Sequence, residues 1–191
     1  RSVVDDLLSR AAEVDTVVCG PGLGDSESTR AAVGAFLEHY DGQAVVDADA
    51  LSVVPEADTS ATLVCTPHHG EVVEMGGPRA DDREQLADRV ADFAADLGHT
   101  LLVKGAHDII SDGETTRINR TGNPGMTVGG TGDVLAGVVG ALLATEKPRA
   151  AAAVGAYVTG RAGDLAADAV GDSLVATDLL NRLPEALTTD E

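Results

Sequence analysis

The sequence predicts an α/β fold in which helices cover both faces of a mostly parallel sheet. Short runs rich in Val and Leu alternate with longer segments whose apolar residues recur at helical spacing. Glycine and acidic residues follow directly after the short runs, where α/β proteins bind their ligands. Asp112 and Gly113, between two short strand-like runs, are a hairpin signal, which adds a small antiparallel portion to the predicted sheet.

The expected strands are four apolar runs and the two arms of the hairpin. The runs DTVVC, QAVV, ATLVC and TLLV have the length and composition of strands that are buried on both faces. They predict strands at residues 15–19, 43–46, 61–65 and 100–103. The hairpin arms are expected at residues 108–111 and 114–118.

The expected helices alternate with these strands and then follow them. In the segment 26–40 the apolar residues recur at helical spacing, and Ser26 or Ser28 is a suitable N-cap. A second helix is expected at residues 80–97. Three more are expected at 131–145, 148–169 and 175–183, after a glycine-rich loop at 119–130. We expect residues 1–191 to form a single, partial domain.

The chain is strongly acidic. Its 32 acidic and 13 basic residues give a formal net charge of 13 − 32 = −19. Such a charge repels phosphate backbones and anionic lipids, so we expect neither a nucleic-acid partner nor a membrane partner. The longest apolar stretch, near residues 134–144, is too short to span a bilayer, and acidic residues near the N-terminus argue against a signal peptide.

The basic residues and the cysteines indicate the habitat. Lys104 and Lys147 are the only lysines, and the remaining basic residues are arginines. Many carboxylates with almost no lysine resemble the composition of proteins from salt-loving archaea, so we expect a halophilic protein of the cytoplasm. Cys19 and Cys65 each end an apolar run, which favours free thiols in a reducing cytosol over a disulfide.

The strongest functional signal is the stretch NPGMTVGGTGDVLAG at residues 123–137. The spacing of its apolar residues predicts a helix that begins near Thr131. The first N–H groups of that helix lack partners within the helix and attract anions. The glycines before it allow the backbone to approach a ligand closely, so we expect a bound phosphate. Asp133 would complement the helix dipole, but beside a phosphate it can instead accept a proton from an attacking hydroxyl.

Four weaker motifs also follow strands. The loop GPGLG at residues 20–24 predicts either a tight connection or a ligand loop. Asp47 and Asp49 in DADAL can hold Mg²⁺ through water, or Asp49 can cap a helix. TPHHGE at 66–71 presents His68, His69 and Glu71 without the spacing of a closed zinc site. We therefore expect a loop that offers an imidazole to a ligand, with Glu71 either capping the next helix or reaching a metal-bound water. Lys104, at a strand end in a lysine-poor chain, favours a phosphate ligand over a solvated surface charge.

Together and in this order, GPGLG, DADAL, TPHHGE, LLVKGAHD and NPGMTVGGTGDVLAG resemble the ADP/ATP-dependent NAD(P)H-hydrate dehydratases, a carbohydrate-kinase-like domain often fused to an NAD(P)H-hydrate epimerase. The resemblance covers about residues 17–143. It implies a ribokinase-like fold, ADP or ATP as co-substrate, and Mg²⁺ held through the nucleotide phosphates rather than by a direct protein site. The implied reaction repairs hydrated NADH or NADPH: the nucleotide phosphorylates the ring hydroxyl, and phosphate is then eliminated.

The resemblance also bears on the oligomeric state and on how much of the family's domain this chain contains. Family members without the epimerase are often tetramers, so we expect a homo-oligomer. The family's domain begins well ahead of its GPGLG strand. This chain is therefore expected to be a piece of a longer protein, or to lack part of the sheet and of the substrate wall, which would leave an unpaired sheet edge.

Roles for individual residues follow from the same resemblance. Gly24 and His68 are expected to contact the hydrated dinucleotide, and Asp133 to be the base that faces its hydroxyl. The resemblance implies second-rank contacts to phosphate or Mg²⁺ from Asn123 and Glu71, and the DADAL carboxylates Asp47 and Asp49 are expected at the same rank from their chemistry. The residues expected around the adenine nucleotide are Lys104, Gly105, Ala106, His107, Asp108, Gly129, Gly130, Thr131 and Gly132, with 129–131 forming the anion hole.

Two other functions remain open. A small-molecule kinase of the ribokinase group would share the anion hole and the aspartate base but release a stable phosphoester. TPHHGE and DADAL argue against it, because they belong to the dehydratase pattern. The second alternative is a catalytically inactive nucleotide-binding fragment that serves as an interaction module.

Overall fold

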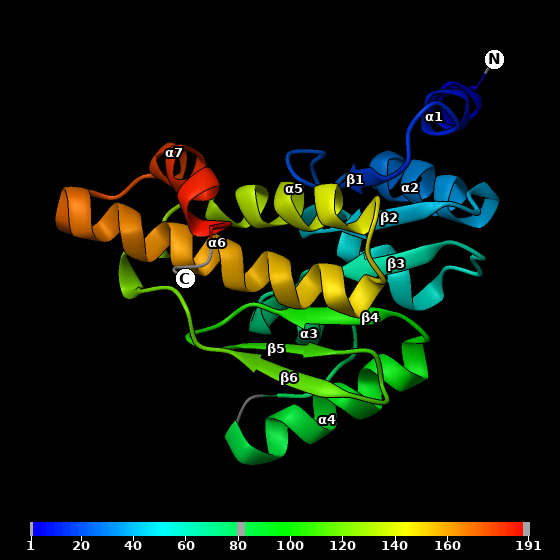
Figure 1. Cartoon of the computed structure of the whole chain (residues 1–191). Helices are drawn as coiled ribbons and strands as arrows, with labels where there is room; N and C mark the ends of the chain where they lie inside the picture. The colour runs from blue at the N-terminus through cyan, green and yellow to red at the C-terminus, as the bar shows by residue number, and fades with distance from the viewer. Residues whose placement is uncertain (1, 80–82, 189–191) are drawn as a thin grey trace.

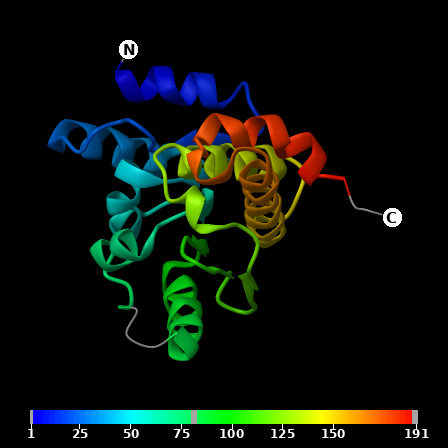
Figure 2. The same ribbon diagram turned by 90° about the vertical axis from the view of Figure 1, so that its left-hand side faces the viewer.

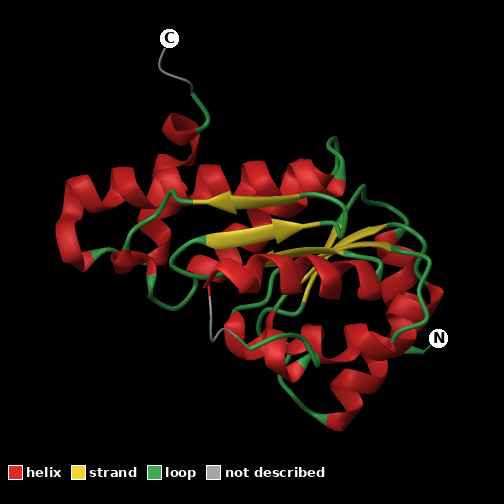
Figure 3. Ribbon diagram, turned by 90° about the horizontal axis from the view of Figure 1, so that it is seen from below, coloured by secondary structure: helices red, strands yellow, loops and turns green. Residues whose placement is uncertain are grey.

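The structure is a computed structural model and describes residues 2–79 and 83–188. In this part of the chain six strands form one sheet, side by side in the order in which they occur in the sequence. They are β1 (Val17–Cys19), β2 (Gln43–Val46), β3 (Thr62–Cys65), β4 (Thr100–Val103), β5 (Asp108–Ser111) and β6 (Thr116–Asn119). β1 to β4 are parallel, whereas β5 and β6 each run antiparallel to the preceding strand (Figure 3).

The helices between the parallel strands share one face of the sheet. They are α2 (Glu27–His39), the 3₁₀ helix η1 (Ala48–Glu56), α3 (His69–Glu74) and α4 (Arg83–Leu97). Crossovers between parallel strands are almost always right-handed, so strands added in sequential order send each connecting helix to the same side. Phe36, Leu51 and Val90 of these helices pack with Leu63 and Leu101 of the sheet in one buried cluster.

The opposite face is covered by the two helices that follow the sheet in the sequence, α5 (Thr131–Leu143) and α6 (Pro148–Val170) (Figures 1 and 2). Val139, Leu143 and Ala152 of these helices pack on Val45 and Leu102 of the sheet. The last helix, α7 (Ala176–Ala186), packs against α6, and the first, α1 (Val3–Ala11), contacts α2. The predicted arrangement of helices on both faces of a mostly parallel sheet is confirmed.

The hairpin turn between β5 and β6 is closed by one carboxylate. Asp112 Oδ1 accepts the N–H groups of Thr115 (2.8 Å) and Glu114 (3.2 Å). Asp112 Oδ2 accepts the Nε–H of Arg149, near the start of α6, at 2.7 Å. The same carboxylate therefore ties the hairpin to the helix that covers it. Because Glu114 and Thr115 belong to this turn, β6 begins at Thr116, two residues later than expected.

Five helical segments of the described chain were not among the predicted helices: α1, η1, α3 and the short 3₁₀ helices η2 (Pro124–Met126) and η3 (Gly171–Ser173). η1 occupies Ala48–Glu56 and so includes most of the DADAL motif that follows β2, and α3 begins at His69, where we expected a loop. Residues 80–82 of the expected helix at 80–97 lie outside the described residues. Ser26 caps α2 as expected, with its Oγ accepting the N–H of Thr29 at 3.1 Å.

The two expected free thiols and the exposed sheet edge are present. Cys19 and Cys65 are free cysteines. Within the described residues β1 pairs with β2 alone, so its outer edge has no strand neighbour. No helix in the described ranges has both the length and the apolar character that crossing a membrane requires.

Candidate active site

The parallel strands bring their carboxyl ends to one edge of the sheet, and the motifs of the sequence meet there. Gly20 follows β1, Asp47 follows β2, Thr66 follows β3 and Lys104 follows β4. A parallel bridge between His68 and Lys104 extends this edge beyond the strands. The N-terminus of α5 lies over the same edge, since a Cβ placed on Gly132 would lie 3.5 Å from Lys104 Nζ and 3.9 Å from Asp47 Oδ2.

The first turn of α5 offers free backbone amides. Gly130, the N-cap, has a φ of +93°, a conformation that glycine adopts without strain. The first hydrogen bond of the helix runs from Val134 N–H to Gly130 O at 3.1 Å, so the amides of Gly132 and Asp133 have no acceptor in the helix. Thr131 Oγ1 lies 2.8 Å from Met126 O and 2.9 Å from Val128 O, which fixes the loop before the helix. This turn can therefore receive an anion.

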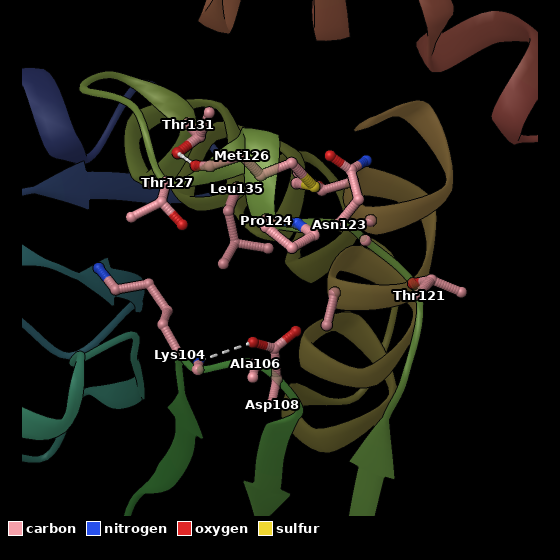
Figure 4. Close-up of a pocket in the computed structure, with 16 residues that line it drawn as sticks. Lys104, Ala106, Asp108, Thr121, Asn123, Pro124, Met126, Thr127, Thr131 and Leu135 are labelled. Carbon is pink, nitrogen blue, oxygen red and sulfur yellow. Dashed lines mark hydrogen bonds between the residues drawn. The ribbon is translucent and has the colours of Figure 1, made fainter. Parts of the chain in front are cut away.

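A cavity of about 370 Å³ lies beside this turn, between β4, β5, α5, α6 and the loop at 121–127 (Figure 4). Six of the nine residues expected around the nucleotide line it: Lys104, Gly105, Ala106 and Asp108 on one wall, and Thr131 and Gly132 on the other. The loop approaches α6 closely, because a Cβ on Gly160 would lie 2.2 Å from Thr121 Oγ1. The other lining residues are Thr121, Gly122, Asn123, Pro124, Met126, Thr127, Leu135, Ala156, Thr159 and Gly160.

Lys104 is not a free surface charge. Its Nζ lies 2.6 Å from Asp47 Oδ1 and 3.9 Å from Glu71 Oε2. Asp47 is 1% exposed, so this ion pair is largely removed from water. Lys104 also lines the cavity, which puts a positive charge near the free amides of α5. Because Asp47 is already paired with an ammonium, it is a poor direct ligand for Mg²⁺. Among the described residues, no group of three or more His, Cys, Asp or Glu side chains is arranged to hold a metal ion.

Asp108 joins the loop after β4 to the end of β6. Its Oδ1 accepts the N–H of Gly105 at 3.1 Å, and its Oδ2 accepts Nδ2–H of Asn119 at 2.9 Å. Burial raises the pKa of Asp108, while these two hydrogen bonds and the nearby charges of His107 and Lys104 oppose the rise. His107 itself is exposed and does not line the cavity.

The loop at 121–127 is held by a second carboxylate, which the sequence analysis did not identify. Asp164 of α6 accepts the N–H of Gly122 at 3.0 Å with Oδ2 and Nδ2–H of Asn123 at 3.0 Å with Oδ1. Asn123 Oδ1 accepts the N–H of Gly125 at 3.0 Å. Both polar atoms of the Asn123 side chain are thus used in hydrogen bonds that hold the loop wall of the cavity. Asp164 lies among small residues of α6, and a charge within such an apolar helix is the signal that could have pointed to it.

Asp133 lies on the opposite side of α5 from the cavity. Successive helix residues are rotated by about 100°, so Thr131 and Leu135 face the cavity while Asp133 faces away. Gly140, seven residues later, shares the face of Asp133, and a Cβ on Gly140 would lie 2.7 Å from Val18 Cγ2. Asp133 is therefore on the side of β1. Its side chain is exposed and carries no hydrogen bond to another described residue.

The remaining expected contacts gather along the strand ends outside the cavity. Gly24 donates its N–H to Asp49 Oδ2 at 2.8 Å, so Asp49 fastens the GPGLG loop and does not cap a helix. His68 caps α3: its Nδ1 accepts the N–H of Glu71 at 3.0 Å, and Glu71 Oε2 accepts the N–H of His68 at 2.7 Å. Because Nδ1 is an acceptor here, the neutral ring carries its proton on Nε2. Gly129 and Gly130 lie in the turn before α5 and do not line the cavity.

Comparisons with known proteins are consistent with one another. A family model described as NAD(P)H-hydrate dehydratase matches residues 2–185. A bifunctional NAD(P)H-hydrate repair enzyme Nnr from Pyrobaculum aerophilum is 44% identical over 190 residues, which are 96% of this chain and 38% of that protein. The chain thus spans little more than a third of the length of that curated relative.

Solved structures share the fold. An ADP/ATP-dependent NAD(P)H-hydrate dehydratase from Bacillus subtilis, co-crystallised with ATP and Mg²⁺, superposes with a TM-score of 0.80 at 30% identity, covering 90% of this chain and 63% of that one. A ribokinase-like superfamily protein from Enterococcus faecalis gives a TM-score of 0.76 at 27% identity, covering 95% of this chain and 65% of that one. The expected ribokinase-like fold is confirmed.

Proposed function

The chain belongs to the NAD(P)H-hydrate dehydratase family, and from that premise we propose that it converts NAD(P)H hydrate to NAD(P)H in a reaction driven by ADP or ATP. The observation that carries the proposal is the position of the first turn of α5. The cavity lies on one side of this turn and Asp133 on the other, with the free amides of Gly132 and Asp133 between them. A phosphoryl group bound by those amides would pass from a nucleotide in the cavity to a hydroxyl beside Asp133.

The nucleotide is proposed to lie in the cavity with its phosphates toward α5. The amides of the first turn and the Lys104 ammonium supply the positive potential that a phosphate needs in a chain of net charge −19. Lys104 is held in place by Asp47, and Glu71 lies 3.9 Å from its Nζ. Gly129, Gly130 and Thr131 shape the turn as an anion hole. The hydrogen bond between Asn123 and Asp164 fixes the loop at 121–127, which forms a wall of the cavity.

The hydrated nicotinamide is proposed to lie on the open side, along the ends of β1 to β3. Gly24 and His68 are at this edge, and Nε2–H of His68 is a donor that a ligand can use. Asp133 accepts the proton of the ring hydroxyl as its oxygen attacks the terminal phosphorus. The new O–P bond forms as the bond from phosphorus to the nucleotide breaks. Phosphate then leaves with the electrons of the carbon–oxygen bond, assisted by the lone pair of the ring nitrogen. The neighbouring ring carbon gives up its proton to water, and the electrons of that C–H bond form the restored double bond.

Mg²⁺ is proposed to enter with the nucleotide. The side chains near the anion site do not form a ready-made metal site, because Asp47 pairs with Lys104 and Asn123 bonds to Asp164 and Gly125. The ion would therefore be held by phosphate oxygens, and Glu71 and Asp49, along the strand ends, would contact it only at second rank. When bound, it neutralises charge that develops on the transferred phosphoryl group.

The test is recovery of reduced cofactor from its hydrate, followed by ultraviolet absorbance with ATP, with ADP and with neither, in molar KCl. We expect recovery only with a nucleotide, together with release of inorganic phosphate. A stable phosphoester formed from an alcohol substrate would instead favour a small-molecule kinase. Nucleotide binding without recovery would favour an inactive binding fragment.

We further propose a setting for this activity. The acidic, lysine-poor composition and the two free thiols fit a salt-rich, reducing cytoplasm. The relative from Pyrobaculum aerophilum is named as bifunctional and is much longer than this chain, which supports function beside or in fusion with an epimerase. The exposed edge of β1 supports association with further chain or a second copy, and a homo-oligomer is proposed on that ground.

A further inference from the structure

One carboxylate in the nucleotide cavity has no part in the proposed phosphoryl transfer. Asp108 is the first residue of β5, lines the cavity, and is directed into the space between Lys104 and the segment containing Asn123 and Pro124 (Figure 4). A carboxylate repels phosphate, so its presence in a phosphate-binding cavity calls for a different ligand group. A carboxylate can only accept hydrogen bonds, which limits its ligand to a donor.

The orientation of Asp108 is fixed by its neighbours. Asn119 is 8% exposed, and its Nδ2 donates to Asp108 Oδ2 at 2.9 Å and to Ala156 O at 3.2 Å. Asn119 Oδ1 accepts the Oγ1–H of Thr121 at 2.9 Å. The N–H of Gly105 holds the other oxygen of Asp108 at 3.1 Å. Each carboxylate oxygen has two lone pairs and uses one of them here, so each retains one for a ligand.

Figure 4 shows Lys104 on one side of the cavity and Pro124 and Thr121 toward the other, with Asp108 between them. The charged end of the cavity consists of Lys104 and the first turn of α5. The apolar end is formed by Pro124, Met126 and Ala156 with the loop against α6. In any nucleotide the ribose lies between the phosphates and the base, and its hydroxyls are donors. The ribose therefore matches the position and the chemistry of Asp108.

We propose that Asp108 accepts a hydrogen bond from a ribose hydroxyl of the bound nucleotide and thereby makes the site selective for ribonucleotides over deoxyribonucleotides. This inference rests on the nucleotide site of the proposed function. Asp108 acts here as a specificity-determining contact, separate from Asp133 and from the anion site.

The test compares the affinities of ADP, 2′-deoxy-ADP and 3′-deoxy-ADP, measured by calorimetry at a mildly alkaline pH that keeps Asp108 ionised. For the wild-type chain we expect at least one deoxy analogue to bind about tenfold more weakly than ADP, because a hydrogen bond to a charged acceptor is lost. In Asp108→Asn, and in Asp108→Ser as a second variant, ADP should weaken and the ratio should fall to within about twofold. Asp92→Asn, an equal charge change on an exposed position of α4, is the matched control and should keep the wild-type ratio.

The outcomes separate this inference from the proposed function. Equal affinity of the wild-type chain for ADP and both deoxy analogues overturns the ribose role while leaving the nucleotide site intact. A variant that weakens all three nucleotides equally shows a purely structural role and also overturns it. If the analogue that binds more weakly is instead purine riboside diphosphate, which lacks the amino group of adenine, then Asp108 contacts the base and the ribose role is overturned. If ADP does not bind the wild-type chain, the inference and the proposed function fail together.

Discussion

The ammonium of Lys104, at the end of β4, reaches across the end of β3 to the carboxylate of Asp47, at the end of β2, with 2.6 Å between Nζ and Oδ1. The two residues are 57 positions apart in the chain. Their pairing holds a positive charge beside the first turn of α5 and keeps a buried carboxylate compensated. Stability and the proposed anion binding therefore depend on the same contact.

Removing the ammonium should be costly to folding. Lys104→Met leaves Asp47 buried without its partner, and we expect the free energy of unfolding to fall by about 3 kcal/mol. The double variant Lys104→Met/Asp47→Asn should lose clearly less, because a neutral amide needs no counter-charge. Urea unfolding in the absence of nucleotide measures both. Equal losses in the single and double variants would show that the pair does not compensate a buried charge.

Asp133 should be needed for turnover but not for nucleotide binding. Asp133→Asn keeps the size of the side chain and the amide of residue 133 while removing the base, so we expect turnover to fall by about 10²-fold or more. The affinity for ADP should stay near the wild-type value. Asp168→Asn, an exposed position of α6, is the matched control. Turnover of the Asp133 variant close to wild type would remove it from the role of base.

The strands and the glycine loops were predictable because their signals are local. The Val- and Leu-rich runs gave β1 to β4 within two residues, and the turn chemistry of Asp112 and Gly113 gave the hairpin. The sequence offered Glu71 as a helix cap, and Glu71 does cap α3. The helix itself was missed because its N-cap is His68, whereas sequence rules associate the capping box with Ser or Thr. The 3₁₀ helix η1 leaves no periodicity that a search at 3.6 residues per turn would detect.

The site was predictable in its segments but not in its internal contacts. Motifs that follow strands were expected at one edge, and the structure brings them there. The pairing of Lys104 with Asp47, and of Asn123 with Asp164, joins residues 57 and 41 positions apart. Such pairs depend on how the strands and α6 are packed, which no local pattern records. For the same reason the position of Asp133 on the far side of α5 emerged only with the helix in place.

The hairpin turn should make stability depend on pH in a specific direction. Burial acts to raise the pKa of Asp112, but the N–H groups of Thr115 and Glu114 and the Arg149 guanidinium outweigh it and lower the pKa. A lowered pKa stabilises the fold above the unfolded value of about 4, and this contribution is lost as the pH falls through the folded pKa. Asp112→Asn should therefore cost about 0.5–1 kcal/mol at about pH 7 and almost nothing at about pH 2.

Urea unfolding of the wild type and Asp112→Asn at both pH values measures this difference. Asp92→Asn provides the control for a general change in charge. A cost that is the same at both pH values would mean that the ionised carboxylate is not what stabilises the turn.

Salt should stabilise the chain. With a net charge of −19, repulsion among carboxylates acts over about 10 Å in 0.1 M salt and about 3 Å in 1 M salt. We expect the melting temperature to rise by about 5–10 °C between these conditions, the shift for a gain of a few kcal/mol in a chain of this size. Sucrose at matched osmolality separates screening from general exclusion effects. A melting temperature that does not change with KCl concentration would contradict the halophilic interpretation.

A buried hydroxyl in the cavity wall should be dispensable for folding. Thr159 is 2% exposed, and its Oγ1 has no hydrogen-bond partner among the described residues. Replacing it by the isosteric valine removes an unsatisfied polar atom, so Thr159→Val should raise the free energy of unfolding by about 1 kcal/mol. Thermal unfolding without nucleotide measures it, with Thr159→Ser as the comparison that keeps the hydroxyl. Destabilisation by valine would reveal a partner for this oxygen.

The order of the sheet has a consequence for biosynthesis. All six strands and the helices on one face are complete by Asn119, whereas the helices that cover the other face lie between Thr131 and Val170. A nascent chain emerging from the ribosome therefore presents Val45, Val64 and Leu102 to solvent until α5 and α6 have been translated. During that interval the growing polypeptide is a natural client for a chaperone that binds apolar sheet surfaces, and stalling within α5 should send it to aggregation or proteolysis.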